Sequence, residues 1–374
     1  MTATHAMLPD ANHDETAEQL FIRDLKTYIA SELDPIEADL ADALDPGSGH
    51  NDRAAETYRR MQDCRGFASY LGLRRASQEL MWDGLAASVA RQSGELDRKA
   101  AEIPLLGSLT LHEDMELPAY LADRDVHLMP GGYAADPGGT AQGALMDRGG
   151  AVYMLGRNGG FLNDGRGWTL ASHVLSRWPD LEPESLIELG CGVGASTVPL
   201  ARAFPGAAVH GLDVGASVLR YAQTRASTLG QAVHFVQGNA EKVPFADASF
   251  DLVCSCVMLH ETSPDALNAI MHESMRLLKP GGIAAHLEVP QRYDSVPLWT
   301  KVRGEIEHDY NNEPNWRPAI SADYAGLLTA AGFIDVATGY QDAAQAAVRG
   351  NDGFSGTSKG VFHSWFVASG RKPA

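Results

Sequence analysis

The feature that most constrains the fold of this chain is residues 186–194, where an apolar run meets a glutamate and then three glycines at alternate positions. The apolar run predicts a buried strand over residues 185–189, and the residues that follow predict a helix over 195–204. Because glycine has no Cβ, a turn of this composition lets free main-chain N–H groups approach a ligand closely. We therefore expect a nucleotide-type pocket between this strand and this helix.

Strands and helices alternate along the rest of the C-terminal half. This alternation is typical of an α/β fold with a doubly wound parallel sheet, helices on both faces and ligands bound beyond the carboxyl ends of the strands. The predicted helices cover residues 169–177, 217–229 and 264–278. Seven strands are predicted, the later six over residues 208–212, 233–237, 250–256, 283–287, 333–338 and 362–370.

Five segments within residues 185–290 are similar to those of class I S-adenosylmethionine-dependent methyltransferases. Glu188 and its glycines match the family's acid-x-Gly-x-Gly-x-Gly pattern, and residues 238–245 resemble its Gly-Asp-Ala-x-x-Leu-Pro-Phe segment, with Asn239 in place of the aspartate. The resemblance implies a Rossmann-like seven-stranded sheet with an antiparallel last strand, S-adenosylmethionine as cofactor and S-adenosylhomocysteine as product. An NAD(P)-dependent oxidoreductase is the alternative, but its fingerprint needs a wider spacing before the last glycine.

The resemblance also implies roles for individual residues in cofactor binding. Asp213, at the end of the second strand, is expected to accept hydrogen bonds from the ribose, because a carboxylate is acceptor-only with two oxygens; the alternative is a helix cap. Asn239 is expected near the adenine, unless it only forms a turn. The expected cofactor-binding residues are Tyr153, Arg157, Glu188, Gly190, Cys191, Gly192, Gly194, Asp213, Val214, Asn239, Ala240 and Glu241.

His260 and Glu261 are the candidate catalytic residues. They follow the fourth strand, where an imidazole could take a proton from the acceptor while the carboxylate orients it, although a structural role is the alternative. Methyl transfer needs such a base only if the acceptor is protonated. A metal held by these two residues with His286, Glu288 and His308 lacks tight ligand spacing, so we predict no metal site.

The chain divides into three predicted regions. Residues 1–105 carry helical patterns over 15–33, 53–71 and 76–99, and are expected to form a dimer interface, a lid, or both. Residues 106–167 are rich in glycine and proline, a composition that predicts irregular structure covering the pocket in place of regular helix. Residues 168–374 form the predicted catalytic domain, with an insertion at 290–320 that lines the acceptor site.

The amino-acid composition limits the kinds of molecule that the chain is expected to bind. A formal charge of −18 disfavours a nucleic-acid substrate, since phosphate binding depends on Lys and Arg. No apolar run reaches the ~20 residues of a membrane helix, and four cysteines without a Cys-x-x-Cys pair indicate reduced thiols in the cytoplasm. We therefore expect a cytoplasmic homodimer that methylates a small molecule, in secondary metabolism. A non-catalytic cofactor-binding or assembly protein of the same fold is the rival interpretation.

Overall fold

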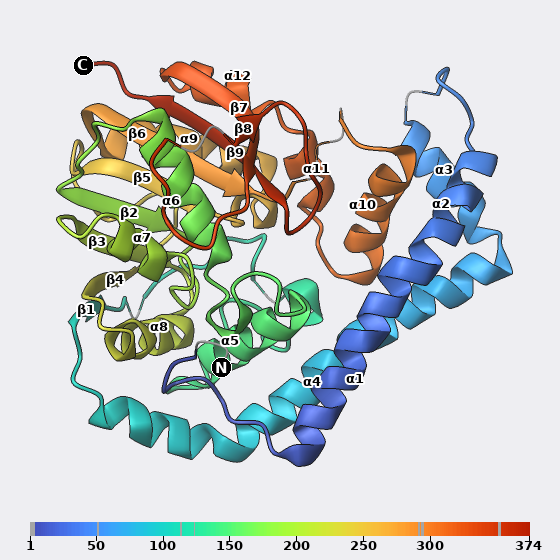
Figure 1. The fold of residues 1–374 in the computed structure, drawn as a ribbon, viewed down its shortest axis with the longest axis horizontal. Helices are drawn as coiled ribbons and strands as arrows, with labels where there is room; N and C mark the ends of the chain where they lie inside the picture. The colour runs from blue at the N-terminus through green and yellow to red at the C-terminus, as the bar shows by residue number, and fades with distance from the viewer. Residues whose placement is uncertain are drawn as a thin grey trace.

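The computed structural model describes residues 4–50, 52–112, 114–122, 124–290, 292, 295–350 and 353–374, and its centre is one mixed sheet (Figure 1). The described strands number nine, in the order β1-β4-β3-β2-β5-β6-β9-β7-β8. They are β1 (Gly107–Thr110), β2 (Ser185–Leu189), β3 (Ala208–Asp213), β4 (Val233–Gln237), β5 (Phe250–Cys256), β6 (Leu278–Glu288), β7 (Ile334–Asp342), β8 (Phe354–Ser355) and β9 (Ser364–Arg371).

Strands β1 to β6 pair in parallel, and β9 enters antiparallel between β6 and β7, so the expected antiparallel last strand is confirmed. The prediction of seven strands was wrong by two, because β1 and β8 extend the two edges. Gly107 opens β1 with φ of +76°, and a Cβ there would lie 2.0 Å from the carbonyl oxygen of Val233. The close pairing of β1 with β4 thus depends on a glycine that looked like part of a loop.

Helices cover both faces of the sheet, as a doubly wound fold requires. Helices α6, α7 and α8 share one hydrophobic core with the strands, while α9 and α12 share the core on the opposite face. The helices of this half are α6 (Gly165–Arg177), α7 (Thr197–Ala203), α8 (Ala216–Thr228), η4 (Leu259–Glu261), α9 (Pro264–Leu277), α10 (Leu298–Tyr310), α11 (Trp316–Ser321) and α12 (Tyr324–Ala330).

The N-terminal region is helical, as predicted, but its helices begin and end elsewhere. Its elements are α1 (His13–Tyr28), the π-helix η1 (Ile29–Leu33), α2 (Asp34–Ala43), α3 (Arg53–Gln62) and α4 (Arg65–Glu102). The break lies at Asp63–Cys64, not at residues 72–75, so α4 runs unbroken for 38 residues. Pro35 has no N–H to continue the α-helical ladder, and the π-helical turn before it closes with Asp34 N–H bonded to the Ile29 carbonyl.

The glycine-rich middle segment contains a regular helix that its composition did not predict. Besides β1, it carries η2 (Val126–Leu128), α5 (Ala141–Tyr153) and η3 (Gly160–Leu162). The glycines of α5 serve close packing: a Cβ at Gly143 would lie 2.3 Å from Tyr221, and one at Gly149 would lie 2.3 Å from Trp82. Glycine here allows helices to approach, and the expectation of irregular structure was wrong for residues 141–153.

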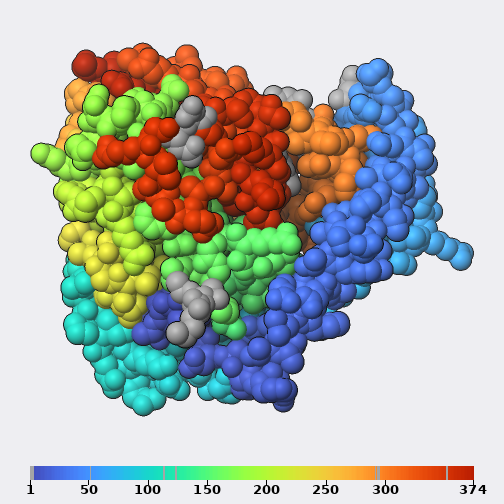
Figure 2. Space-filling view, in the orientation of Figure 1, coloured from blue at the N-terminus to red at the C-terminus, as the bar shows by residue number. Residues whose placement is uncertain are grey.

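The N-terminal helices reach across to the far end of the catalytic half. Helices α1 and α4 lie side by side and extend away from the sheet toward α10 (Figure 1). Tyr58, Phe67 and Tyr70 share a hydrophobic core with Val302 and Ile306 of α10. In the space-filling view these helices, in blue, adjoin the orange region of α10 and the green middle segment (Figure 2). Among the described helices, none is both long and apolar enough to cross a membrane.

Candidate active site

One cavity of about 530 Å³ opens beyond the carboxyl ends of the parallel strands. The wall nearest the sheet is formed at the ends of β2, β3, β4 and β5. These strands lie on both sides of the point where the strand order reverses, and doubly wound sheets bind ligands at such a point. Small-molecule sites usually have volumes of about 300–1,000 Å³. The predicted residues that line it are Tyr153, Gly190, Cys191, Gly192, Asp213, Val214, Asn239, Ala240, His260 and Glu261.

The glycine turn is strained in a way that only glycine tolerates. Gly190, Gly192 and Gly194 have φ of +65°, +51° and +75°. A Cβ at Gly190 would lie 2.2 Å from Cγ of Met258, and one at Gly192 would lie 2.8 Å from Cε of Met146. Gly194 has no such close neighbour and lies outside the cavity lining, so its backbone conformation is its contribution.

Asp213 links the end of β3 to the glycine turn. Its carboxylate accepts hydrogen bonds from the main-chain N–H groups of Gly192 (2.8 Å) and Gly215 (3.0 Å). Burial raises the pKa of this carboxyl, and these hydrogen bonds oppose the rise. The carboxylate therefore has a fixed position on the cavity wall, where each oxygen keeps a further lone pair for a ligand.

Glu188 is fully buried in β2 and lies outside the cavity lining. Its two oxygens accept hydrogen bonds from the hydroxyls of Ser196 and Thr197, at the start of α7. Burial raises the pKa of Glu188 to about 7, although the two hydroxyls hold it down. These contacts fix the start of the helix that follows the glycine turn, and the family's role for Glu188, steadying the turn and the methionine amino group, stays a prediction.

Asn239 lines the cavity, but its side chain also closes a local turn. Its Oδ1 accepts from the N–H of Glu241 at 2.9 Å, and its Nδ2 lies 3.3 Å from Oε1 of Glu241. Glu241 itself lies outside the lining and accepts a hydrogen bond from Tyr120 at 2.9 Å. Asn239 therefore forms the turn that was considered as the alternative and also lines the pocket.

An arginine other than the predicted one lines the cavity. Arg157 is exposed, stacks over Phe362 at 5.6 Å and lies outside the lining. Arg166, in the first turn of α6, lines the cavity instead. Within the described residues its guanidinium has no hydrogen bond or ion pair, only a cation–π contact of 5.9 Å with Trp365. The signal that could have found it is its position in the helix leading to the glycine strand.

The acceptor half of the cavity is walled by elements outside the parallel sheet. Side chains from the N-terminal helices, the middle segment and the predicted insertion meet here; residues 291, 293 and 294 of that insertion, including Tyr293, lie outside the described residues. The main contributors are Lys26, Gln78, Trp82, His127, Tyr133, Tyr153, Arg303, Glu307, Tyr310 and Trp316. Eight aromatic side chains line the cavity as a whole and provide apolar surface between the charged groups: Trp82, Tyr120, Tyr133, Tyr153, Tyr310, Trp316, Phe362 and Trp365.

His260 and Glu261 both reach this half, with their polar atoms already engaged. His260 Nδ1 lies 2.8 Å from Glu288 Oε2, and its Nε2 lies 3.1 Å from Glu261 Oε1. Burial opposes charge on the imidazole, but the two carboxylates raise the pKa of His260 to about 10. Both ring nitrogens of His260 face a carboxylate in place of an acceptor, so this geometry does not favour the predicted base role.

Two further residues, which were not predicted as site residues from the sequence, contact Oε1 of Glu261. Tyr133 donates its hydroxyl at 2.8 Å, and Nε2 of His127 lies 3.0 Å away. His127 Nδ1 lies 2.7 Å from Glu313 Oε1. Burial opposes charge on the imidazole of His127, but the carboxylates of Glu313 and Glu261 raise its pKa well above the usual range.

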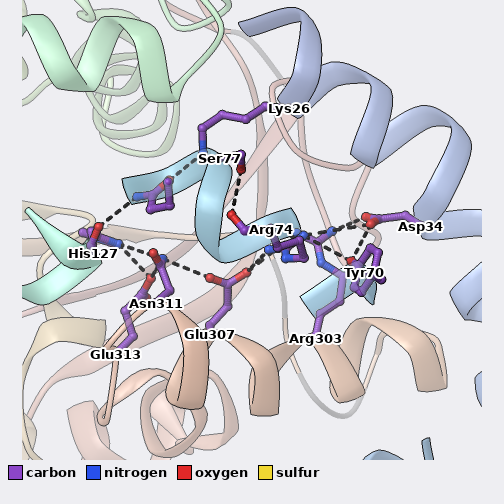
Figure 3. A network of polar contacts seen from close by, with 11 residues as sticks. Lys26, Asp34, Tyr70, Arg74, Ser77, His127, Arg303, Glu307, Asn311 and Glu313 are labelled. Carbon is purple, nitrogen blue, oxygen red and sulfur yellow. Dashed lines mark hydrogen bonds and ion pairs between the residues drawn. The ribbon is translucent and has the colours of Figure 1, made fainter. Parts of the chain in front are cut away.

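A polar network fastens the N-terminal helices to this wall (Figure 3). Lys26 donates to Gln78 at 2.5 Å, and Gln78 donates to the carbonyl of His127 at 2.9 Å. Farther along, Arg74 donates to Glu307 at 2.7 Å. The network is completed by Asn311, which bonds both Glu307 and Glu313, and by Arg303 and Tyr70, which contact Asp34.

Comparison with known proteins identifies the class. Residues 186–282 match the family model of a methyltransferase domain. An uncharacterized methyltransferase of Synechocystis sp. is 38% identical over 155 residues, which are 41% of this chain and 68% of that protein. A fatty-acid O-methyltransferase of Mycolicibacterium smegmatis is 32% identical, over 34% of this chain and 45% of its own length.

The similarity to solved structures is weaker. A phosphoethanolamine N-methyltransferase 2 of Haemonchus contortus, in complex with phosphomonomethylethanolamine and S-adenosylhomocysteine, is 18% identical and covers 62% of this chain and 58% of that chain, with a TM-score of 0.43. The chain belongs to the class I S-adenosylmethionine-dependent methyltransferases. S-adenosylmethionine is accordingly its cofactor, as predicted, and these matches give the oxidoreductase alternative no support.

Proposed function

We propose that this chain transfers the methyl group of S-adenosylmethionine to a small-molecule acceptor. The observation that carries the proposal is the continuity of the cavity, which runs from the glycine turn and Asp213 to an aromatic wall built by the N-terminal helices, the middle segment, α10 and α11. A wall of this kind excludes water and aligns an acceptor with the sulfonium methyl group, which is the main requirement of an in-line displacement. The fatty-acid O-methyltransferase relative supports a small, largely apolar acceptor.

In this proposal the residues at the strand ends hold the cofactor. Asp213 and Val214 take the ribose, and Asn239 with Ala240 lies beside the adenine. Arg166 replaces Arg157 as the group that binds the methionine carboxylate, because it lines the cavity without a hydrogen-bond or ion-pair partner among the described residues. Tyr153 lines the same cavity but on its acceptor side.

His260 and Glu261 have a positioning role in this proposal. Their mutual contact, and that of His260 with Glu288, keep them fixed on the acceptor wall. A nucleophile such as a neutral amine or a thiolate needs no base, so a fixed polar wall is sufficient for it. Glu241 acts from behind, through its hydrogen bonds with Asn239 and Tyr120.

The proposed oligomeric state and cellular compartment are those expected from the sequence. We propose a homodimer formed through the N-terminal helices, supported by Phe21 and Tyr28, which lie on one stripe of α1 and expose 61% and 53% of their surfaces. The four cysteines are all free, which supports a reducing compartment such as the cytoplasm. Secondary metabolism and the absence of a nucleic-acid partner stay predictions, as does the division at residues 105 and 167.

The test is formation of S-adenosylhomocysteine by the purified protein with a panel of small-molecule acceptors. We expect acceptor-dependent turnover by the wild type and a large loss in Asp213→Ala. Tight binding of S-adenosylhomocysteine by calorimetry, with no turnover of any acceptor class, supports the rival of a non-catalytic cofactor-binding protein. No binding of either cofactor form contradicts the proposal itself.

A further inference from the structure

Two histidines and a carboxylate from three distant segments converge on the acceptor side of the cavity. His127 belongs to η2, His260 to η4, and Glu313 to the loop between α10 and α11. One ligand atom from each lies within 4.8 Å of the other two. Of the five residues considered from sequence, His260 belongs to this cluster, whereas His286 is buried in β6 against Ser255 and His308 is exposed on α10.

The imidazole of His127 is held in place by an unusual backbone. His127 has φ of +57°, and Leu128 after it has φ of +58°. The carbonyl of His127 is fixed by Trp82, which donates at 2.7 Å, and by Gln78, which donates at 2.9 Å. A non-glycine residue kept in this conformation costs free energy, and such residues cluster at functional sites.

The imidazole of His260 is oriented by a carboxylate behind it. Glu288 accepts from Nδ1 at 2.8 Å and is itself fixed by the main-chain N–H of Leu259 at 2.7 Å. Its Nε2 lies on the side of the cluster, 3.1 Å from Glu261 Oε1. A carboxylate that accepts from one ring nitrogen while the other binds a metal is the usual support of a metal-binding histidine.

Glu313 supplies the independent observation. The residue is 2% exposed, and its Oε2 is buried without a hydrogen-bond partner in the described structure. A buried carboxylate oxygen without a hydrogen-bond partner costs free energy of folding unless another group neutralises its charge. The hydrogen bonds of the surrounding network therefore account for only one of its two oxygens.

We propose that His127, His260 and Glu313 form a site for one divalent transition-metal ion. Two imidazoles and one carboxylate suit Fe²⁺, Mn²⁺ or Zn²⁺, whereas Mg²⁺ and Ca²⁺ prefer oxygen ligands alone. Glu261 is the nearest additional donor, with Oε1 at 3.0 Å and 3.1 Å from the two Nε2 atoms. Three protein ligands leave coordination positions open, and both histidines line the cavity.

The site also defines a class of acceptor, an inference that rests on the proposed function. An oxygen acceptor with two adjacent donors, such as a vicinal diol or a hydroxycarbonyl compound, occupies the open positions as a chelate. The ion lowers the pKa of the bound hydroxyl, which releases its proton to solvent. The oxygen then forms a bond to the methyl carbon as the carbon–sulfur bond breaks, with the electron pair remaining on sulfur.

The test is a metal titration of the whole, chelator-treated protein with Mn²⁺, Zn²⁺ and, without oxygen, Fe²⁺. We expect one ion per chain for the wild type, and affinity lowered by at least about 10- to 100-fold in His127→Gln and in Glu313→Gln. The matched control is His272→Gln, which removes an exposed imidazole of α9. Pulsed electron paramagnetic resonance of the Cu²⁺-loaded wild type is expected to report two histidine nitrogens.

Titration of the same samples with S-adenosylhomocysteine separates the two proposals. Metal binding without cofactor binding keeps the metal site and contradicts the methyltransferase proposal. Cofactor binding without a stoichiometric ion, or with an ion that Glu313→Gln binds as tightly as the wild type, overturns the metal site alone. If a variant does not fold, the wild-type stoichiometry and its nitrogen signature decide, and fewer than two histidine nitrogens overturn the assignment.

Discussion

The main-chain N–H of Gly192 donates a hydrogen bond of 2.8 Å to the carboxylate of Asp213. The two residues lie on different strand ends, so this bond makes the glycine turn and the end of β3 one rigid surface. Any ligand that contacts both is bound by a site already formed before it arrives. Loss of the carboxylate should therefore affect ligand affinity more than the fold.

Asp213→Ala is expected to weaken S-adenosylhomocysteine binding by about 10- to 100-fold, since a hydrogen bond to a charged group contributes about 1.5–3 kcal/mol. Calorimetry measures the affinity, and thermal unfolding checks the fold. The matched control is Asp247→Ala, whose side chain is 80% exposed. Unchanged affinity in Asp213→Ala removes the ribose assignment.

Arg166→Met is expected to weaken cofactor binding to a similar degree, because its guanidinium lines the cavity without a hydrogen bond or ion pair among the described residues. Arg157→Met, at the position first predicted, serves as the comparison and should bind as the wild type does. Titration of both with S-adenosylhomocysteine makes the measurement. If Arg157→Met is the weaker binder, the original prediction stands and Arg166 is structural.

Gly190→Ala should lower both stability and cofactor affinity. The new Cβ would lie 2.2 Å from Cγ of Met258, at a φ of +65° that alanine rarely adopts. Strain of this kind costs about 1–3 kcal/mol, which thermal unfolding can measure. Gly206→Ala is the control, since a Cβ there meets nothing within 4 Å. Equal melting temperatures for the two variants would contradict the strained turn.

Lys26 should give the protein a pH-dependent stability. Burial, aided by the charge of Arg74, lowers the pKa of Lys26 to about 7, with Glu307 opposing. An unfolded lysine keeps a pKa of about 10.4, so between about pH 7 and pH 10 only the unfolded state binds this proton. The free energy of unfolding therefore rises with pH across this window.

Lys26→Met removes this effect, so the difference in melting temperature between pH 7 and pH 9 should shrink. Lys242→Met, an exposed lysine, should leave that difference as in the wild type. If Lys26→Met and the wild type show the same pH dependence, the pKa of the Lys26 amine is not lowered in the folded state.

Phe21→Glu tests the homodimer. We expect the wild type to sediment as a dimer and the variant as a monomer, because a charge replaces the apolar centre of the exposed stripe on α1. Asp24→Glu, on the same helix, is the conservative control. A wild type that is monomeric at micromolar concentration contradicts the dimer.

Much of the sheet could be predicted because local pattern determined it. The strand before the glycines was placed at residues 185–189, and β2 occupies those residues. The region around Gly107 and Gly143 could not be predicted, because the reason for each glycine is a neighbour far away in the sequence, Val233 and Tyr221. Glycine for close approach and glycine for a loop look the same in a sequence.

The cofactor half of the site could be predicted for a similar reason. Gly190 and Asn239 follow strands and Asp213 is the last residue of one, and parallel strands end at one edge of the sheet. The acceptor half could not, because His127 and Glu313 are brought to His260 only by tertiary packing of segments without a shared pattern. Arg157 was predicted from its place upstream of α6, and Arg166 was not considered, because the sequence does not show which side of α6 faces the cavity.

The division of the cavity between two sources has a consequence for relatives of this protein. In the proposed function the stretch that matches the methyltransferase family model, residues 186–282, supplies the surface for the donor, while much of the opposite wall comes from α1, α4 and α10. Under the proposed function, likeness over residues 186–282 therefore reports on the shared methyl donor, whereas the choice of second substrate depends on helices that lie outside that stretch.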